Sequence, residues 1–324
     1  MKTYMQYLVI LLDDTSVAYC HANNPLTEHH LMPIETLRKA ILFGMKQNLM
    51  IQYVYPDYEL PAEYAEVIES IDHVKIGRDV KVYNGVPAHI EGKTAVLRLT
   101  IGEFIEKQYD IAALLPQVER LNISLTDIES FKDEQIETYK KALDTIAKVA
   151  GNLLISSAKD DSAKSVGGVN IITDRLSLKE MHNCEAGVGN ITVAPNGKFY
   201  LCPAFYYDEK MGVSNRMNHA KPESTRSVGD LDSGLNIPNK QLLQLDHAPL
   251  CRNCDAYHCN RCIWLNDRLT MDANTPSRQQ CIVAHLERNA TRTLQLSLQQ
   301  KGIQAGDEIP ELTYLDPFEV KEEW

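Results

Sequence analysis

The run Cys251-Arg-Asn-Cys254-Asp-Ala-Tyr-His-Cys259-Asn-Arg-Cys262 holds four of the 8 cysteines of this 324-residue chain. Thiolates spaced this closely are typical ligands of zinc and of iron–sulfur clusters. The start of the chain carries no recognisable secretion signal, so we expect a cytoplasmic protein with reduced thiols. The run therefore predicts that the second half of the chain folds around metal and not around disulfide bonds.

Three more cysteines flank this run in a regular order. Twelve residues separate Cys184 from Gly197, four separate Gly197 from Cys202, and eighteen separate Cys262 from Cys281. The Asn-Gly pair that ends at Gly197 is typical of a β-hairpin, and in such a turn both residues are expected to have positive φ angles. We expect this hairpin to bring Cys202 back beside Cys184, so that one turn unites two metal ligands.

The spacing leaves two kinds of metal site open. Zinc sites usually join two ligand pairs that stand well apart, and the gap of four residues between Cys254 and Cys259 is tight for an independent zinc ribbon. Iron–sulfur clusters accept closely spaced thiolates, and one run can serve two clusters. Seven thiols divide into four and three, which favours two iron–sulfur clusters and keeps zinc as the alternative.

The first half of the chain alternates strand and helix patterns. Apolar runs and β-branched residues predict strands, and apolar residues at helical spacing predict the segments between them. This order implies parallel strands joined by crossovers, in an open doubly wound sheet or a partial barrel. We expect strands at 7–12, 49–55, 73–76, 80–83, 95–100, 118–125 and 169–172, helices at 33–47, 62–70, 102–115, 133–150 and 283–299, and a loop at 208–240.

Composition excludes two classes of partner. The formal net charge is −11 and the basic residues are scattered, which argues against nucleic acid, because phosphate binding needs a basic face. No apolar run reaches the roughly 18 residues that span a bilayer, so we expect no membrane segment.

The cysteine order resembles the SPASM extension of radical S-adenosylmethionine peptide maturases, whose four-cysteine run is slightly wider in its later gaps. That extension binds two auxiliary 4Fe–4S clusters. The fourth ligand of the inner cluster stays open between a substrate thiolate, a water molecule, Asp255 and His258. The resemblance implies that the outer cluster is held by Cys251, Cys254, Cys259 and Cys281, and that the inner one has three ligands, Cys184, Cys202 and Cys262.

The alternating first half resembles the partial (β/α)6 barrel of radical S-adenosylmethionine enzymes, but it departs from it after the first strand. Those enzymes carry CxxxCxxC there, three thiolates that leave one iron open to S-adenosylmethionine. This chain reads Cys20-His-Ala-Asn-Asn24-Pro-Leu-Thr27 instead. Because Asn24 and Thr27 supply no thiolate, we expect no such cluster and no cleavage of S-adenosylmethionine by this chain. Cys20 is expected to be a small buried hydrophobic residue.

A barrel without its catalytic cluster, joined to intact SPASM cysteines, resembles the CXXX-repeat peptide maturase family. The resemblance implies the iron–sulfur subunit of a two-component maturase, in a heterodimer with a radical S-adenosylmethionine enzyme. Its substrate would be a ribosomal precursor peptide with repeated cysteines, and its product would carry thioether links. The alternative is a non-catalytic peptide-binding or zinc-stabilised scaffold protein, so whether the chain is itself an enzyme stays open.

The same reading divides the chain into three parts. We expect a degenerate radical-S-adenosylmethionine-like barrel in residues 1–180 and a SPASM domain with two auxiliary clusters in residues 181–305. Residues 306–324 are expected to form an extended tail.

Overall fold

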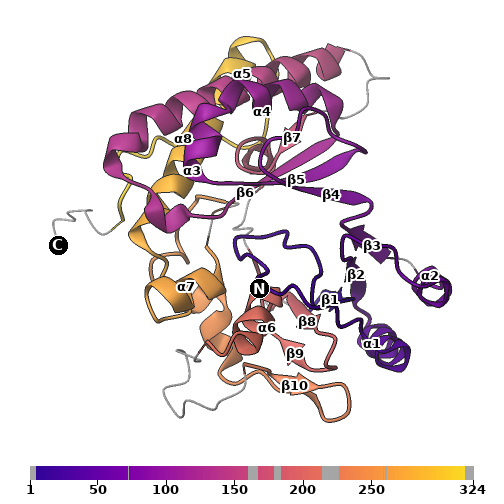
Figure 1. Ribbon diagram of the computed structural model, residues 1–324. Coiled ribbons are helices and arrows are strands. Elements are labelled where there is room, and N and C mark those ends of the chain that lie inside the picture. The colour runs from indigo at the N-terminus through magenta and orange to yellow at the C-terminus, as the bar shows by residue number, and fades with distance from the viewer. Residues whose placement is uncertain are drawn as a thin grey trace. The chain divides into compact units, whose positions relative to one another are not determined.

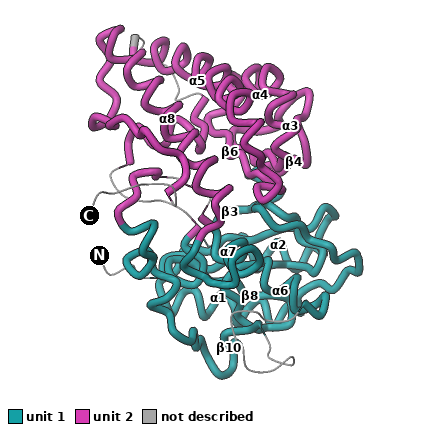
Figure 2. The backbone as a smooth tube through the Cα atoms, turned by 90° about the vertical axis from the view of Figure 1, so that its left-hand side faces the viewer, with its two compact units in different colours: residues 1–80, 185–252, 262–275 teal, residues 81–184, 253–261, 276–324 magenta. Residues whose placement is uncertain are grey.

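The computed structural model describes residues 5–71, 73–159, 167–178, 184–213, 226–257, 259 and 261–317. The chain forms two compact units, drawn in teal and magenta in Figure 2. Unit 1 comprises residues 1–80, 185–252 and 262–275, and unit 2 comprises residues 81–184, 253–261 and 276–324. The expected boundaries after residues 180 and 305 divide the chain differently and stay a prediction.

The chain is an α/β protein with a nine-stranded, mostly parallel sheet (Figure 1). The strands follow the order β7-β6-β5-β4-β3-β2-β1-β8-β9, and a separate two-stranded sheet pairs β10 with β11. The strands are β1 (Tyr7–Leu11), β2 (Met50–Val54), β3 (His73–Ile76), β4 (Val80–Asn84), β5 (Thr94–Leu99), β6 (Arg120–Leu125), β7 (Gly168–Val169), β8 (Asn190–Val193), β9 (Phe199–Tyr200), β10 (Gly229–Asp230) and β11 (Gly234–Leu235).

Helices connect β1 to β2, β2 to β3, β5 to β6 and β6 to β7. The helices are α1 (Ile34–Lys46), α2 (Ala62–Ile68), α3 (Ile101–Glu106), α4 (Gln108–Leu114), α5 (Ile136–Lys159), α6 (Pro203–Lys210), α7 (Ile263–Leu269) and α8 (Arg278–Gln300). Within the part of the chain that the structure describes, no helix is both long and apolar enough to cross a membrane.

In unit 1, the apolar run at the start of the chain forms β1, as predicted. It pairs in parallel with β2 on one side and β8 on the other, with Ile10 opposite Tyr53 and Val193. Helix α1 ends where expected, because Asn48 takes a left-handed conformation with φ 55°. An asparagine is among the few non-glycine residues that adopt this conformation at small cost.

The predicted hairpin is confirmed, but its turn is of another type. Strands β8 and β9 pair antiparallel, with Thr192 opposite Tyr200. Of the two turn residues Asn196 and Gly197, only Gly197 has a positive φ, 75°. Its amide donates to the Ala194 carbonyl at 2.9 Å. Pro195 lies two residues before Gly197, and proline is favoured at the first central position of a type I turn. The hairpin is therefore closed by a three-residue loop, in which a type I turn is followed by a glycine with positive φ.

In unit 2, helices α4, α5 and α8 lie together on one side of β5 and β6 (Figure 1). The helix expected over 102–115 is two helices, because the chain leaves helical geometry at Lys107. Thr100 begins the first of them through a capping box, in which its side chain accepts from the Glu103 amide. Helix α5 runs past its expected end at residue 150 to Lys159.

As far as the structure describes it, the chain does not contain all six strand–helix repeats of the (β/α)6 barrel that the resemblance implies. The described residues between β3 and β5 contain no helix. Gly77 and Gly85 have φ angles of 94° and 97° there, and Pro87 follows. These residues favour turns, because a helix needs negative φ and an amide donor at each step. The nine strands form a sheet, and its closure into a partial barrel stays a prediction.

Tyr55, which follows β2 in unit 1, gives a pH-dependent prediction. Burial, reinforced by Glu69 and opposed by Arg78, raises the pKa of its phenol to about 12. An unfolded tyrosine ionises near pH 10, so this contribution to stability is full below pH 10 and is lost as the pH rises towards 12. Two pKa units correspond to about 2–3 kcal/mol. Unfolding by urea between pH 8 and 12 should show a smaller loss in Tyr55→Phe than in the parent, and equal losses would contradict the assignment.

Candidate metal centre

The seven predicted ligands are shared between the two units. Each of the chain's cysteines lies in the described residues, and none of them forms a disulfide bond. Among the residues described, no group of three or more His, Cys, Asp or Glu side chains is close enough to hold a metal ion. The predicted ligand sets therefore stay predictions. Unit 1 contains Cys202, Cys251 and Cys262, and unit 2 contains Cys184, Cys254, Cys259 and Cys281.

The three cysteines of unit 1 are buried, with 6–8% of each residue exposed. Cys202 directly precedes α6 and Cys262 directly precedes α7. These two helices are joined by a hydrogen bond in which the Trp264 indole donates to Asp208 Oδ2 at 2.9 Å. The sequence of unit 1 thus keeps two predicted ligands at the starts of two helices that are bonded to each other.

In unit 2, Cys254 and Cys259 lie in one loop with similar backbone surroundings. The Ala256 amide points at Cys254 Sγ at 3.4 Å, and the Arg261 amide points at Cys259 Sγ at 3.3 Å. Amide donors of this kind stabilise a thiolate and tune any metal that it binds. The two thiols are close enough to interact electrostatically. The backbone of the loop therefore directs one amide at each of the two sulfur atoms.

Without metal, Cys254 holds its proton. Burial is the main cause that raises the pKa of this thiol to about 11; the Ala256 amide opposes it, and the neighbouring Cys259 and Asp255 add to it. A metal ion binds the thiolate, so binding would release this proton.

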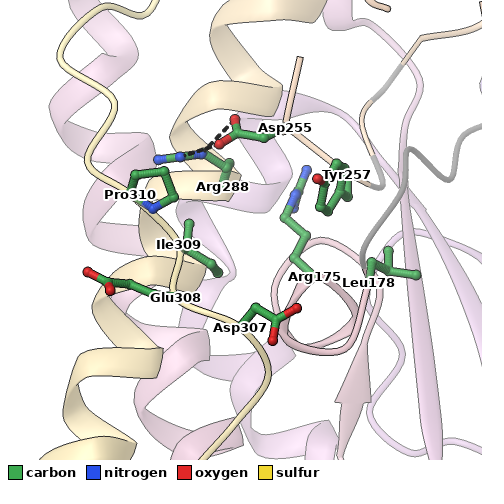
Figure 3. Close-up of a pocket in the computed structure, with 9 residues that line it drawn as sticks. All are labelled: Arg175, Leu178, Asp255, Tyr257, Arg288, Asp307, Glu308, Ile309 and Pro310. Atoms are coloured by element: carbon green, nitrogen blue, oxygen red, sulfur yellow. Dashed lines mark hydrogen bonds and ion pairs between the residues drawn. The ribbon is translucent and has the colours of Figure 1, made fainter. Parts of the chain in front are cut away.

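The same loop is anchored to α8 by an ion pair. Arg288, which is 1% exposed, donates through Nε to Asp255 Oδ1 at 3.0 Å and through Nη2 to the other carboxylate oxygen. Figure 3 shows this pair beside a cavity of ≈ 140 Å³ that Arg175, Tyr257 and Asp307 also line. Asp255 is one option for the fourth ligand of the inner cluster, and its carboxylate is thus already paired with Arg288. His258, another option, lies outside the described residues.

Beneath this loop, unit 2 contains a buried ionic network. Glu287 accepts from the Tyr139 hydroxyl at 3.0 Å and from Arg175 Nη2 at 3.1 Å. The side chains of Arg175 and Glu287 are 1% and 0% exposed. Burial, followed by the Glu287 charge, raises the pKa of Tyr139 well above its usual value. The network fixes α8 to α5 and to the turn that holds Arg175.

The loop after β1 contains the positions at which the resemblance would place CxxxCxxC. Asn24, at the second of the three positions, donates through Nδ2 to the backbone carbonyls of Asp14 and Ser16, both at 2.8 Å. It therefore acts as a structural side chain that closes the loop. Cys20, expected to be buried, is partly exposed.

The sequence reasoning missed a polar cluster at the end of β1. Asp14 is 3% exposed and pairs with Lys210 Nζ at 2.9 Å and with His30 Nδ1 at 3.3 Å. The Tyr206 hydroxyl also donates to it, and burial followed by this bond raises the pKa of Tyr206. Two aspartates directly after a buried strand were the available signal, since ligands often bind at the carboxyl ends of parallel strands.

A second missed residue is His285, whose Nε2 lies 3.7 Å from Cys254 Sγ. The helix was expected to begin at residue 283, but α8 begins at Arg278, after a capping box at Ser277. Cys281 and His285 therefore share one face of a helix, four residues apart.

No model of a known protein family matches the chain, and no curated protein matches it either.

Proposed function

We propose that this chain is the iron–sulfur subunit of a two-component radical S-adenosylmethionine maturase that forms thioethers in a cysteine-containing peptide. The observation that carries the proposal is the set of three buried thiols in unit 1, Cys202, Cys251 and Cys262. They belong to an ordered series of seven cysteines that the resemblance assigns to two 4Fe–4S clusters. The finer fold is part of the proposal: a degenerate partial barrel followed by a SPASM domain.

The residues present suit this cofactor. Thiolates are the usual ligands of iron–sulfur clusters. Burial of the ligand positions excludes the water that would degrade a cluster. The partner would bind and cleave S-adenosylmethionine, because Asn24 and Thr27 of this chain offer no thiolate for that cluster.

Thioether formation removes two hydrogen atoms from the peptide. The partner's radical takes one of them from carbon, and the cysteine thiol gives up the other as a proton, with one electron left over. When bound, an auxiliary cluster supplies a site for the substrate thiolate and an acceptor for that electron. The protein's own part is to hold the peptide cysteine and exclude water.

Metal analysis and reconstitution test the proposal. Anaerobically purified protein should contain iron and sulfide and show the broad thiolate-to-iron absorption band. With a radical S-adenosylmethionine partner and a Cys-repeat peptide, mass spectrometry should show the loss of two hydrogen atoms per link only when this chain is present. Full modification without this chain, or a protein without iron, would reject the proposal.

The zinc-stabilised scaffold is the second candidate, and one observation favours it. A cysteine and a histidine face each other in unit 2, and mixed Cys/His sets are typical of structural zinc. Zinc without iron in the purified protein would replace the maturase proposal with this one.

A further inference from the structure

Cys254 and His285 lie at the separation of two ligands on one metal ion. The distance from Cys254 Sγ to His285 Nε2 is 3.7 Å. On a tetrahedral zinc ion, with bonds of about 2.3 Å to sulfur and about 2.1 Å to nitrogen, the two donor atoms lie about 3.6 Å apart. In a 4Fe–4S cluster each iron takes one protein ligand, so two protein donors stand farther apart than this. The observed pair therefore matches a single ion better than a cluster.

The imidazole is oriented as a metal ligand. His285 Nδ1 bonds to the backbone carbonyl of Leu315. A carbonyl oxygen only accepts, so Nδ1 carries the proton and Nε2 presents its lone pair towards Cys254. Metal-binding histidines are commonly fixed in this way, with the second nitrogen bonded to a backbone carbonyl. His285 is 4% exposed as a residue, and its ring meets the Tyr314 ring edge-on at 5.7 Å between centroids, so packing holds the direction of the ring.

Two further thiolates belong to the same unit as this pair. Cys259 interacts with Cys254 across the loop, and Cys281 lies one helical turn before His285 on the same face of α8. The Asp255–Arg288 ion pair fixes the loop to the next turn of α8. Loop and helix are thus joined by two contacts, Cys254 to His285 and Asp255 to Arg288. Among the described residues no three such side chains already surround one point, so Cys259 and Cys281 would have to move towards the pair to complete the set.

We infer that His285 is a metal ligand and that it shares one zinc ion with Cys254, Cys259 and Cys281. Three thiolates and one imidazole form a closed tetrahedral set, typical of structural zinc. The inference changes one part of the proposed function, because zinc in unit 2 takes the place of the outer cluster that the resemblance implies for Cys251, Cys254, Cys259 and Cys281. It leaves the three buried thiols of unit 1, Cys202, Cys251 and Cys262, for a single 4Fe–4S cluster. Iron content and zinc content then separate the two statements.

The test uses full-length protein produced with both metals and purified without oxygen. We expect about one zinc and about four irons per chain. X-ray absorption at the zinc edge should fit three sulfur atoms at about 2.3 Å and one nitrogen at about 2.0 Å. His285→Ala should lose zinc and keep iron, His285→Cys should keep zinc with four sulfur neighbours, and the exposed control His89→Ala should change neither.

Each other outcome is informative. About eight irons and no zinc would overturn this inference and leave the proposed function intact. Zinc with only sulfur neighbours in the parent protein, or full zinc in His285→Ala, would also overturn it, and the contact would then be a thiol-to-imidazole hydrogen bond. Protein with neither metal would reject both. The spectrum of the parent protein decides the matter even if a variant fails to fold.

Discussion

Replacing Cys262 with serine is expected to abolish thioether formation while the chain stays folded. Cys262 is buried at the start of α7, in the unit that also contains Cys202 and Cys251. A serine hydroxyl is far less acidic than a thiol and binds iron poorly, so the cluster that Cys262 is proposed to hold should not form. The iron of that cluster, about four atoms per chain, should be lost, and peptide modification should fall at least about a hundredfold.

Cys20→Ser is the matched control. It is the one cysteine outside the ordered series, and it lies in the loop that Asn24 closes. Iron content and peptide modification should both match the parent protein. If Cys262→Ser lost iron and still modified the peptide at the parent rate, the cluster would be structural, and the result would support the alternative of a non-catalytic peptide-binding protein. Circular dichroism and urea unfolding of each variant show whether the comparison is between folded proteins.

The main elements of the fold followed from local sequence. The apolar run before Asp13 is β1, and the left-handed Asn48 ends α1 where the sequence placed that end. These features depend on neighbours within a few residues, which is why periodicity and turn chemistry detected them. The hairpin at Gly197 was found for the same reason, although the pairing of its first strand with β1 is a long-range contact.

Long-range order was the part that the sequence could not provide. The division into two units depends on contacts between stretches that are far apart in the chain. The break of the expected helix at Lys107 arises where two short helices adapt to packing against α5, and local propensity does not record it.

The candidate site shows the same contrast. Cysteine spacing predicts the candidate ligands, because ligand types and gaps are written in the sequence. It did not predict the contact of Cys254 with His285 or of Asp255 with Arg288, which join residues 31 and 33 positions apart. An error of five residues in the start of α8 hid the shared face of Cys281 and His285. Element boundaries, more than element types, limited what could be said about the site.

The buried carboxylate of Glu287 gives the largest expected effect on stability. Glu287 lies on α8 between His285 and Arg288, and it accepts from Tyr139 and Arg175. In Glu287→Leu the charge of Arg175, whose side chain is 1% exposed, would remain buried without this carboxylate. Breaking a buried ion pair in this way costs about 3–5 kcal/mol. The free energy of unfolding in urea should fall by that amount.

Two matched changes show that the loss comes from the buried charge. Glu287→Gln keeps the volume and a hydrogen-bonding oxygen and removes the charge, so its loss should be smaller. Glu137 on the exposed surface of α5 pairs with Lys140 at 2.7 Å, and its replacement by alanine should change stability little, because exposed ion pairs contribute little. Equal losses in Glu287→Leu and Glu137→Ala would contradict a role for the buried network. Because the network fixes the turns of α8 that carry His285 and Arg288, the zinc ion inferred at His285 should also leave Glu287→Leu at a lower concentration of chelator than it leaves Glu287→Gln.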